Sequence, residues 1–190
     1  MNSTTLYIRN MVCNRCIKVV KDEFAKLNLE ITEIELGKVT ISSNLEEIEV
    51  SEISDVLYNN GFELINDKKS QLIDKIKTLI IEKIHHSNDG LESINSSEYI
   101  VREIGYDYSY LSNLFSSVEG LTIEKYIINQ KIEKIKELLY YEELTINEIS
   151  YQLGYSSVQH LSTQFKKITG LSPSNFKKLK GNMRKSIDQL

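Results

Sequence analysis

The chain has few residues of the kinds that cross-link or stiffen a small protein, with two cysteines and one proline among 190 residues. Cys13 and Cys16 are only two residues apart, so they cannot build a disulfide framework. The first residues, Met1 to Thr5, show neither a basic nor an apolar run, and we expect no signal peptide. No apolar run approaches the ~18 residues that a membrane span requires. These absences predict a reduced, cytoplasmic protein without a membrane segment.

The sequence also lacks the side-chain sets on which common enzymes depend. It shows no Ser/His/Asp set, no glycine loop that would cradle a phosphate and no pair of catalytic carboxylates. The three histidines, His85, His86 and His160, form no recognisable site. We therefore expect no enzyme, no catalytic residue and no required cofactor.

Acidic side chains are absent from a long stretch near the C-terminus, Ile149 to Ser186. Residues 1–70 hold 8 basic and 12 acidic side chains and residues 71–190 hold 15 of each, so the net charge of −4 comes from the first part. The basic side chains of the acid-free stretch are Lys166, Lys167, Lys177, Lys178, Lys180, Arg184 and Lys185. They form either a solvated lysine-rich end or a patch that faces nucleic-acid phosphates.

The second half of the chain contains one pattern twice, fifty residues apart. The matching pairs are Leu111 and Leu161, Ser112 and Ser162, Phe115 and Phe165, Gly120 and Gly170, Leu121 and Leu171, Thr122 and Ser172, and Tyr126 and Phe176. Upstream the offset falls to 49, as in Gly105 and Gly154, which indicates one additional residue in the second turn. Each copy reads as helix, turn and helix, closed by a glycine. A helix-turn-helix of this kind places its second helix in a DNA major groove.

Apolar spacing predicts a helix over 71–86, one from Ser96 or Ser97 that stops near Gly105, and one that starts at about Tyr108. Further helices are predicted over 122–139, 145–154 and 157–167, with a last one from 173. The expected caps are Ser96 or Ser97, Thr122, Thr145 in a capping box with Glu148, and Ser172 before Pro173. The side chains expected to face the core are Ile100, Ile104, Leu111, Leu114, Phe115, Val118, Leu161, Phe165 and Ile168. The long helix from Thr122 is expected to act as a rigid spacer, with Ile128, Ile132, Ile135 and Leu139 along one seam.

The opposite helix faces carry small polar side chains. They are Ser109, Ser112, Asn113 and Ser116 in the first copy and Gln159, Ser162, Thr163 and Lys166 in the second. Such side chains suit base edges and phosphates in a groove, or they form an ordinary solvated helix face. Val158 is expected either to pack inside or to meet the methyl group of a thymine.

Several segments of this repeat resemble the sequence pattern of the AraC/XylS family of bacterial transcription regulators. They are Gly154-Tyr155-Ser156-Ser157, Leu161-Ser162, Phe165-Lys166-Lys167, Gly170-Leu171-Ser172-Pro173 and Phe176-Lys177. The resemblance covers about residues 71–180 and implies a seven-helix DNA-binding domain with two helix-turn-helix motifs joined by a linker helix. It implies DNA contacts from Ser109, Ser112 and Asn113 in the first motif, and from Val158, Gln159, Ser162 and Thr163 in the second. Lys166, Lys167 and Lys177 are expected to face phosphates.

Residues 5–66 show a different pattern, in which strands and helices alternate as β-α-β-β-α-β. The expected elements are a strand at 6–8, a helix from Cys16 carrying Val19, Val20, Phe24 and Leu27, a hairpin of 29–36 and 38–42 around Gly37, a helix at 50–60 and a strand at 61–65. This is the order of the ferredoxin-like split unit. The predicted fold class is therefore α+β: a ferredoxin-like βαββαβ domain (1–68), an all-α domain with two helix-turn-helix motifs (69–182) and a basic tail (183–190).

The loop Met11-Val12-Cys13-Asn14-Arg15-Cys16, together with this order, resembles the heavy-metal-associated domains of copper chaperones and metal-transporting ATPases. The two thiolates could hold Cu(I) or another soft metal ion. We expect the helix start, Arg15 and Lys18 to lower both thiol pKa values. The alternative is a scaffold that binds a partner, or a second copy of itself, without a metal.

A zinc site completed by His85 and His86 is disfavoured, because adjacent helical residues point about 100° apart. Both histidines are expected at the frayed end of a helix.

The intact repeat favours a transcription regulator that binds double-stranded DNA and inserts two recognition helices into successive major grooves. The N-terminal domain would modulate it through a metal or a partner, or form a homodimer, and RNA polymerase is a further candidate partner. The alternative is a soluble metal-handling protein whose helical half is a docking module.

Overall fold

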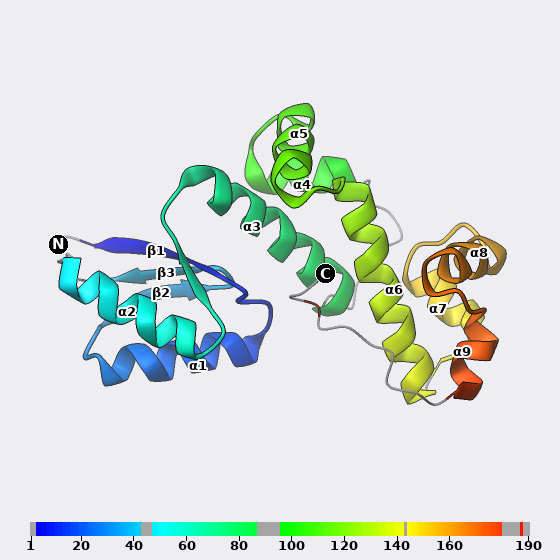
Figure 1. Ribbon diagram of the computed structural model, residues 1–190, viewed down its shortest axis with the longest axis horizontal. Coiled ribbons are helices and arrows are strands. Elements are labelled where there is room, and N and C mark those ends of the chain that lie inside the picture. The colour runs from blue at the N-terminus through cyan, green and yellow to red at the C-terminus, as the bar shows by residue number, and fades with distance from the viewer. Residues whose placement is uncertain (1–2, 43–46, 87–95, 143, 180–186, 188–190) are drawn as a thin grey trace. The chain divides into compact units, whose positions relative to one another are not determined.

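The computed structural model describes residues 3–42, 47–86, 96–142, 144–179 and 187 (Figure 1). The chain divides into two compact units, Met1–Leu79 and Ile80–Leu190. This division falls within helix α3 (Lys68–Ile81), which begins near the expected domain boundary at 68/69. That boundary stays a prediction. Of the expected basic tail, only Ile187 lies among the described residues.

The N-terminal unit has the β-α-β-β-α-β order that the sequence predicts. Its elements are β1 (Thr4–Arg9), α1 (Asn14–Lys26), β2 (Ile31–Glu35), β3 (Lys38–Ile41), α2 (Glu47–Asn59), β4 (Glu63–Ile65) and the first part of α3. The strands form one antiparallel sheet in the order β2-β3-β1-β4. The β2–β3 hairpin turns at Gly37, whose φ of +77° is readily adopted only by glycine.

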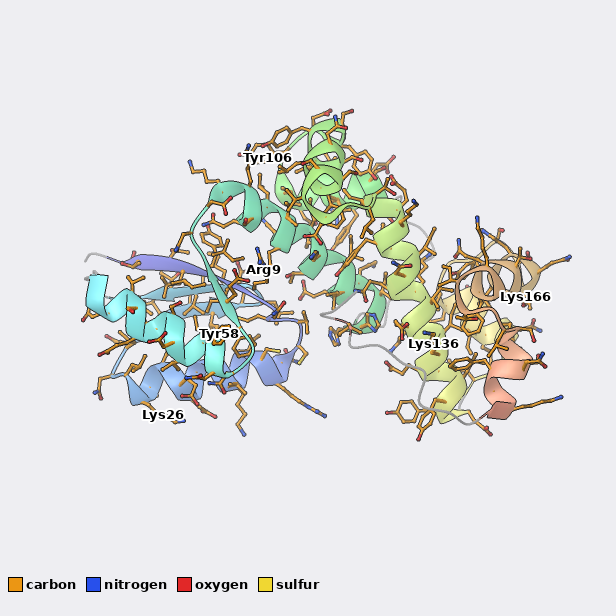
Figure 2. All side chains as sticks on the ribbon, in the orientation of Figure 1. Arg9, Lys26, Tyr58, Tyr106, Lys136 and Lys166 are labelled. Atoms are coloured by element: carbon orange, nitrogen blue, oxygen red, sulfur yellow. The ribbon has the colours of Figure 1, made fainter. Side chains whose placement is uncertain are left out.

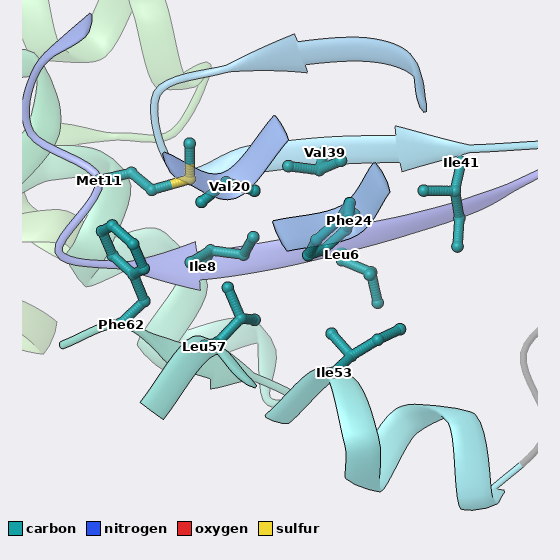
Figure 3. Packing of buried hydrophobic residues seen from close by; sticks show 10 residues of the cluster. All are labelled: Leu6, Ile8, Met11, Val20, Phe24, Val39, Ile41, Ile53, Leu57 and Phe62. Atoms are coloured by element: carbon teal, nitrogen blue, oxygen red, sulfur yellow. The ribbon is translucent and has the colours of Figure 1, made fainter. Parts of the chain in front are cut away.

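One face of this sheet is covered by α1 and α2 (Figure 1). Strand side chains alternate between the two faces, so Leu6 and Ile8 of β1 point to the same side. They are buried there with Val39 and Ile41 of β3, Val20 and Phe24 of α1, and Ile53 and Leu57 of α2 (Figure 3). Burying each of these side chains contributes about 1.5–3 kcal/mol to folding. The alternation expected from the sequence thus builds the core of the unit.

The regular elements described in the C-terminal unit are all helices. After the end of α3 it contains the π-helical turn η1 (Glu82–His86), α4 (Ser96–Ile104), α5 (Tyr108–Glu119), α6 (Ile123–Tyr141), α7 (Ile146–Gln152), α8 (Val158–Thr169) and α9 (Pro173–Leu179). The two expected helix-turn-helix motifs are α4–α5 and α7–α8. Among the described residues, no helix is both long and apolar enough to cross a membrane.

The expected caps at Thr122, Thr145 and Ser172 are confirmed, whereas the expected cap at Ser96 or Ser97 is wrong, because both serines lie inside α4. Thr122 Oγ1 accepts a hydrogen bond from the Lys125 amide, and Thr145 and Glu148 form the reciprocal capping box. Ser172 accepts from the Asn175 amide, just before Pro173 opens α9. The next position after α5 and after α8 is a left-handed glycine, Gly120 with φ 70° and Gly170 with φ 78°.

The one-residue slip in the repeat lies in the turns. Asp107 is the N-cap of α5 and Ser157 is the N-cap of α8. One residue separates Gly105 from Asp107, whereas two residues separate Gly154 from Ser157. The additional residue is Ser156, and it changes the offset between the copies from 49 before the turn to 50 after it.

The core of the helical unit repeats as well. The Phe115 ring meets Tyr126 with centroids 5.6 Å apart, and Phe165 meets Phe176 at 5.4 Å. The second motif packs on the predicted seam of α6 through Ile132, Ile135, Leu139, Ile149, Leu153, Leu161, Phe165 and Phe176. The long helix α6 therefore joins the two motifs as a common support.

Two predicted core positions are wrong. Val118 is 58% exposed and Ile168 is 45% exposed. These residues occupy the same place in the two copies, in the last turn of α5 and of α8. The helices that precede them, α4 and α7, are shorter than α5 and α8, so the helical spacing continues after the packing partner has ended.

The expected frayed end at His85 is also wrong. His85 Nε2 lies 2.8 Å from Gln130 Oε1, and burial lowers the pKa of His85 to about 4. The buried Gln130 also donates to the hydroxyl oxygen of Tyr126 at 3.0 Å and to the carbonyl oxygen of Ile187 at 3.0 Å. Periodicity could not predict this cluster, because it joins residues from three distant segments of the chain.

Candidate nucleic-acid interface

Helix α8 presents a polar face because its opposite face is fixed in the core. Ser157 Oγ accepts from the His160 amide at 3.1 Å, which fixes where the helix begins. Leu161 and Phe165 are completely buried. The side chains at the surface include those predicted: Gln159, Thr163, Lys166 and Lys167 are exposed, and Val158 and Ser162 are half-buried. Lys166 projects from α8 at the surface (Figure 2).

The spacing of these residues places them along one side of the helix. Gln159, Thr163 and Lys166 follow one another at the three- and four-residue intervals that align side chains. Lys177 is exposed on α9 and lies 3.9 Å from Glu142 Oε2, a weak surface pair. The arrangement combines groups that can bond to base edges with cations that suit phosphates.

Helix α5 is positioned by two contacts that the sequence analysis missed. Asp107 Oδ1 accepts from the amides of Ser109 at 2.8 Å and Tyr110 at 3.3 Å. Tyr108 donates its hydroxyl to Glu124 Oε1 at 2.5 Å, which joins the start of α5 to the first turn of α6. An aspartate directly before a helix signals an N-cap. The tyrosine pair has no comparable sequence signal.

These contacts also change the acidity of the groups involved. Burial, with the added effect of Glu124, raises the pKa of the Tyr108 hydroxyl, and the hydrogen bond from Tyr108 lowers the pKa of Glu124. Of the predicted contact residues of α5, Ser109 and Asn113 are exposed and Ser112 is half-buried.

The surfaces of the two motifs differ in charge. Helix α8 ends with Lys166 and Lys167, whereas the last turn of α5 has no basic residue. Acidic side chains predominate around the first motif: Glu98, Glu103, Asp107, Glu119 and Glu124, against Arg102 and Lys125. The positive potential that attracts DNA is therefore concentrated on the second motif.

The predicted metal ligands lie together in the N-terminal unit. Cys13 is the N-cap of α1, one position ahead of its first residue, Asn14, so the helix begins earlier than the predicted Cys16. The two Sγ atoms are 3.5 Å apart, and Cys16 Sγ lies 3.7 Å from the carbonyl oxygen of Asn10. Among the described residues, no group of three or more His, Cys, Asp and Glu side chains is placed to hold a metal ion.

Only Cys13 has the lowered pKa that the sequence predicts for both thiols. For Cys13, burial acts to raise the pKa, but hydrogen bonds from Cys16 and the Arg15 amide, with the Arg15 charge, lower it overall. The pKa of Cys16 is raised, first by burial and further by the Cys13 thiol, so that part of the prediction is wrong.

Comparison with known proteins identifies a family in the helical half. Residues 100–179 match the family model of the helix-turn-helix domain. The msm operon regulatory protein of Streptococcus mutans is 29% identical over 150 residues, 78% of this chain and 53% of that protein. The xylose operon regulatory protein of Escherichia coli is 31% identical over 99 residues, 52% of this chain and 25% of that protein. The chain thus spans about half the length of these relatives, or less.

One solved structure is similar in fold as well as sequence. The C-terminal domain of AraT, a response regulator from Geobacillus stearothermophilus, superposes with a TM-score of 0.51 at 26% identity, covering 63% of this chain and 92% of that domain.

The C-terminal half of the chain is a helix-turn-helix domain. More particularly, it is a domain of the AraC type, with two motifs on one linker helix, as the sequence resemblance implies. The resemblance of residues 5–66 to heavy-metal-associated domains stays a prediction.

Proposed function

We propose that the protein is a sequence-specific regulator of transcription that places α5 and α8 in successive major grooves of double-stranded DNA. The observation that carries this proposal is the pair of matching motifs supported by one helix. The 19 residues of α6 span about 28 Å at ~1.5 Å per residue. Successive major grooves on one side of DNA recur every ~34 Å. The names of the relatives, which are operon regulators, support the same function.

The roles of the residues follow from their positions. In the second motif, Gln159 and Thr163 contact base edges, with Val158 and Ser162 beside them. Lys166, Lys167 and Lys177 contact phosphates. In the first motif, Ser109, Ser112 and Asn113 contact the adjacent groove. A regulator of this kind acts on the chromosome, in the cytoplasm.

Footprinting on the promoter region of its own gene tests this arrangement. We expect one chain to protect two patches about one helical turn apart. The Gln159→Ala, Thr163→Ala double variant should lose one patch selectively, while a Lys26→Ala variant, altered in the N-terminal unit, should protect both. A single short patch per chain would contradict the arrangement.

For the N-terminal unit we propose a ferredoxin-like domain over residues 1–68 whose two thiols hold Cu(I) or a similar soft ion. The facing Sγ atoms, 3.5 Å apart at the start of α1, and the lowered pKa of Cys13 support this site. A regulatory role requires metal and DNA to alter each other's affinity equally. Dimerisation through this unit and contact with RNA polymerase stay predictions.

Titration of Cu(I) under reducing conditions tests the thiol site. We expect tight uptake by the wild type and its loss in a Cys13→Ser, Cys16→Ser double variant. Equal uptake of Cu(I) by both proteins would show that the two thiols do not form a metal site. Tight uptake with unchanged operator affinity would leave a metal site without a regulatory role.

A further inference from the structure

Lys131 lies in the middle of α6 and directs its ammonium group into the second helix-turn-helix motif. Its Nζ atom donates to the carbonyl oxygen of Leu153 at 2.7 Å, and it lies 5.2 Å from the centre of the Tyr155 ring. Leu153 is the C-cap residue of α7. Among the described residues, no carboxylate forms an ion pair with Lys131. The cation is therefore balanced by neutral groups.

Both of these groups suit a cation. The C-terminal end of a helix carries partial negative charge on its last carbonyl groups, and a lysine there satisfies one of them. The face of an aromatic ring is also electronegative. Burial lowers the pKa of Lys131, as expected for an ammonium group largely withdrawn from water. A buried charge is costly unless it is bonded, so this side chain strongly favours the observed position of the turn.

The turn between α7 and α8 contacts helix α8 through Tyr155. Tyr155 donates its hydroxyl to Gln164 Oε1 at 2.6 Å, and its ring lies nearly perpendicular to the His160 ring at a centroid distance of 5.4 Å. The Tyr155 amide also donates to the carbonyl oxygen of Ser150 at 2.9 Å, which closes the end of α7. His160 and Gln164 are one helical turn apart on α8. Tyr155 therefore contacts α8 at both His160 and Gln164, and Lys131 contacts the Tyr155 ring.

The rotation of α8 decides which side chains reach a groove. Successive residues of a helix point about 100° apart, so a rotation of a few tens of degrees would move Gln159 and Thr163 away from base edges. Lys131 also lines a small cavity together with Tyr99 and Ile100 of α4. On the helix that joins the motifs, Lys131 therefore contacts the second motif and lies near the first.

We propose that Lys131 is a positioning residue, which fixes the rotation of α8 through the turn and thereby sets how well the second motif discriminates DNA sequences. This inference rests on the proposed function. Lys131 contacts no nucleic acid itself in this scheme, so its removal should change sequence discrimination rather than the number of phosphate contacts.

The test compares Lys131→Met, which keeps the apolar stem, with Lys131→Arg, which keeps the charge. For Lys131→Met we expect the ratio of specific to non-specific DNA affinity to fall about tenfold, with an unchanged slope of affinity against salt. Lys131→Arg should restore most of the ratio. Lys125→Met, on the same helix but exposed, should leave it unchanged. An unchanged ratio in Lys131→Met would overturn the inference while leaving DNA binding intact.

A second measurement needs no DNA. Amide hydrogen exchange of the free protein should be at least tenfold faster in the 153–157 turn of Lys131→Met than in the wild type, with the 105–107 turn unchanged. Equal exchange rates in the 153–157 turn would overturn the inference. If Lys131→Met fails to fold, Tyr155→Phe provides a second variant, because it removes only the hydrogen bond to Gln164. This variant should show the same loss of sequence discrimination. Discrimination equal to that of the wild type would overturn the inference.

Discussion

The two helix-turn-helix motifs share a backbone but differ in what holds and surrounds it. Each has a capped recognition helix, a left-handed glycine at its end and a ring pair in its core. The second motif adds lysines on α8 and a turn fixed by Lys131. The first has a largely acidic surface and a turn in which Tyr106 is 50% exposed and stacks on Tyr110. The comparison indicates that core residues define the motif, while its affinity for DNA depends on residues that the core leaves unconstrained.

The largest expected effect tests whether the two cores are equivalent. Phe165→Ala and Phe115→Ala should each lower the free energy of unfolding by about 3–5 kcal/mol, because both rings are completely buried. Urea denaturation measures this loss. The matched controls Ile168→Ala and Val118→Ala alter exposed apolar side chains and should cost about 0.5 kcal/mol or less. A loss below 1 kcal/mol for either phenylalanine would mean that its motif is not packed as described.

The next effect concerns the buried contact between His85 and Gln130 of α6. The pKa of His85 is about 4 in the folded state and 6.5 when unperturbed, so the unfolded chain binds more protons between these values. Stability should therefore fall as the pH is lowered from 6.5 to 4, by on the order of 2–3 kcal/mol from this residue. Urea denaturation of wild type and His85→Gln over this range isolates the contribution. Parallel losses in the two proteins would exclude His85 as its source.

Base contacts should differ between the motifs. Gln159→Ala or Thr163→Ala should lose roughly 1–3 kcal/mol of discrimination between sites, as expected for removal of a good base contact. Ser109→Ala, at the repeat position of Gln159, should lose less, because a serine makes at most one short contact. Competition binding with specific and non-specific DNA provides the measurement. Unchanged affinities for both DNAs in Gln159→Ala and Thr163→Ala would show that the orientation of α8 is wrong.

The smallest effect is electrostatic, and it can be tested by moving a lysine from the second motif to the first. Lys166 and Ser116 occupy the same repeat position. Lys166→Ser should weaken binding to all DNA sequences alike and reduce the slope of log affinity against log salt concentration by about 1. Ser116→Lys should strengthen binding to all sequences and increase this slope by about 1. Lys26→Ser carries the same charge change in the N-terminal unit and should leave the slope unaltered. A sequence-dependent loss in Lys166→Ser would make this lysine a base contact.

Much of this arrangement is predictable from the sequence because it depends on local rules. Thr145 with Glu148, and Ser172 before Pro173, are caps that satisfy amides a few residues away. Helical spacing also places Leu161 and Phe165 in the core. Spacing fails at Ile168 because it does not show where the neighbouring helix ends.

Long-range polar contacts are the other part that sequence could not predict. His85 meets Gln130, and Lys131 meets Leu153, through the folded geometry alone. In the N-terminal unit, the element order followed from alternation, whereas the raised pKa of Cys16 depends on burial that no motif records. Of the candidate interface, the polar face of α8 was predictable, and the side chains that fix its rotation were not.

The extra residue in the second turn, Ser156, limits how the two copies can recombine. A recognition helix transplanted from its N-cap onward, Asp107 or Ser157, keeps its register. One cut by counting residues from Gly105 or Gly154 would be one residue out of register, which is a ~100° change of face on a helix. Segments therefore exchange between the two copies only when the copies are aligned on these N-caps.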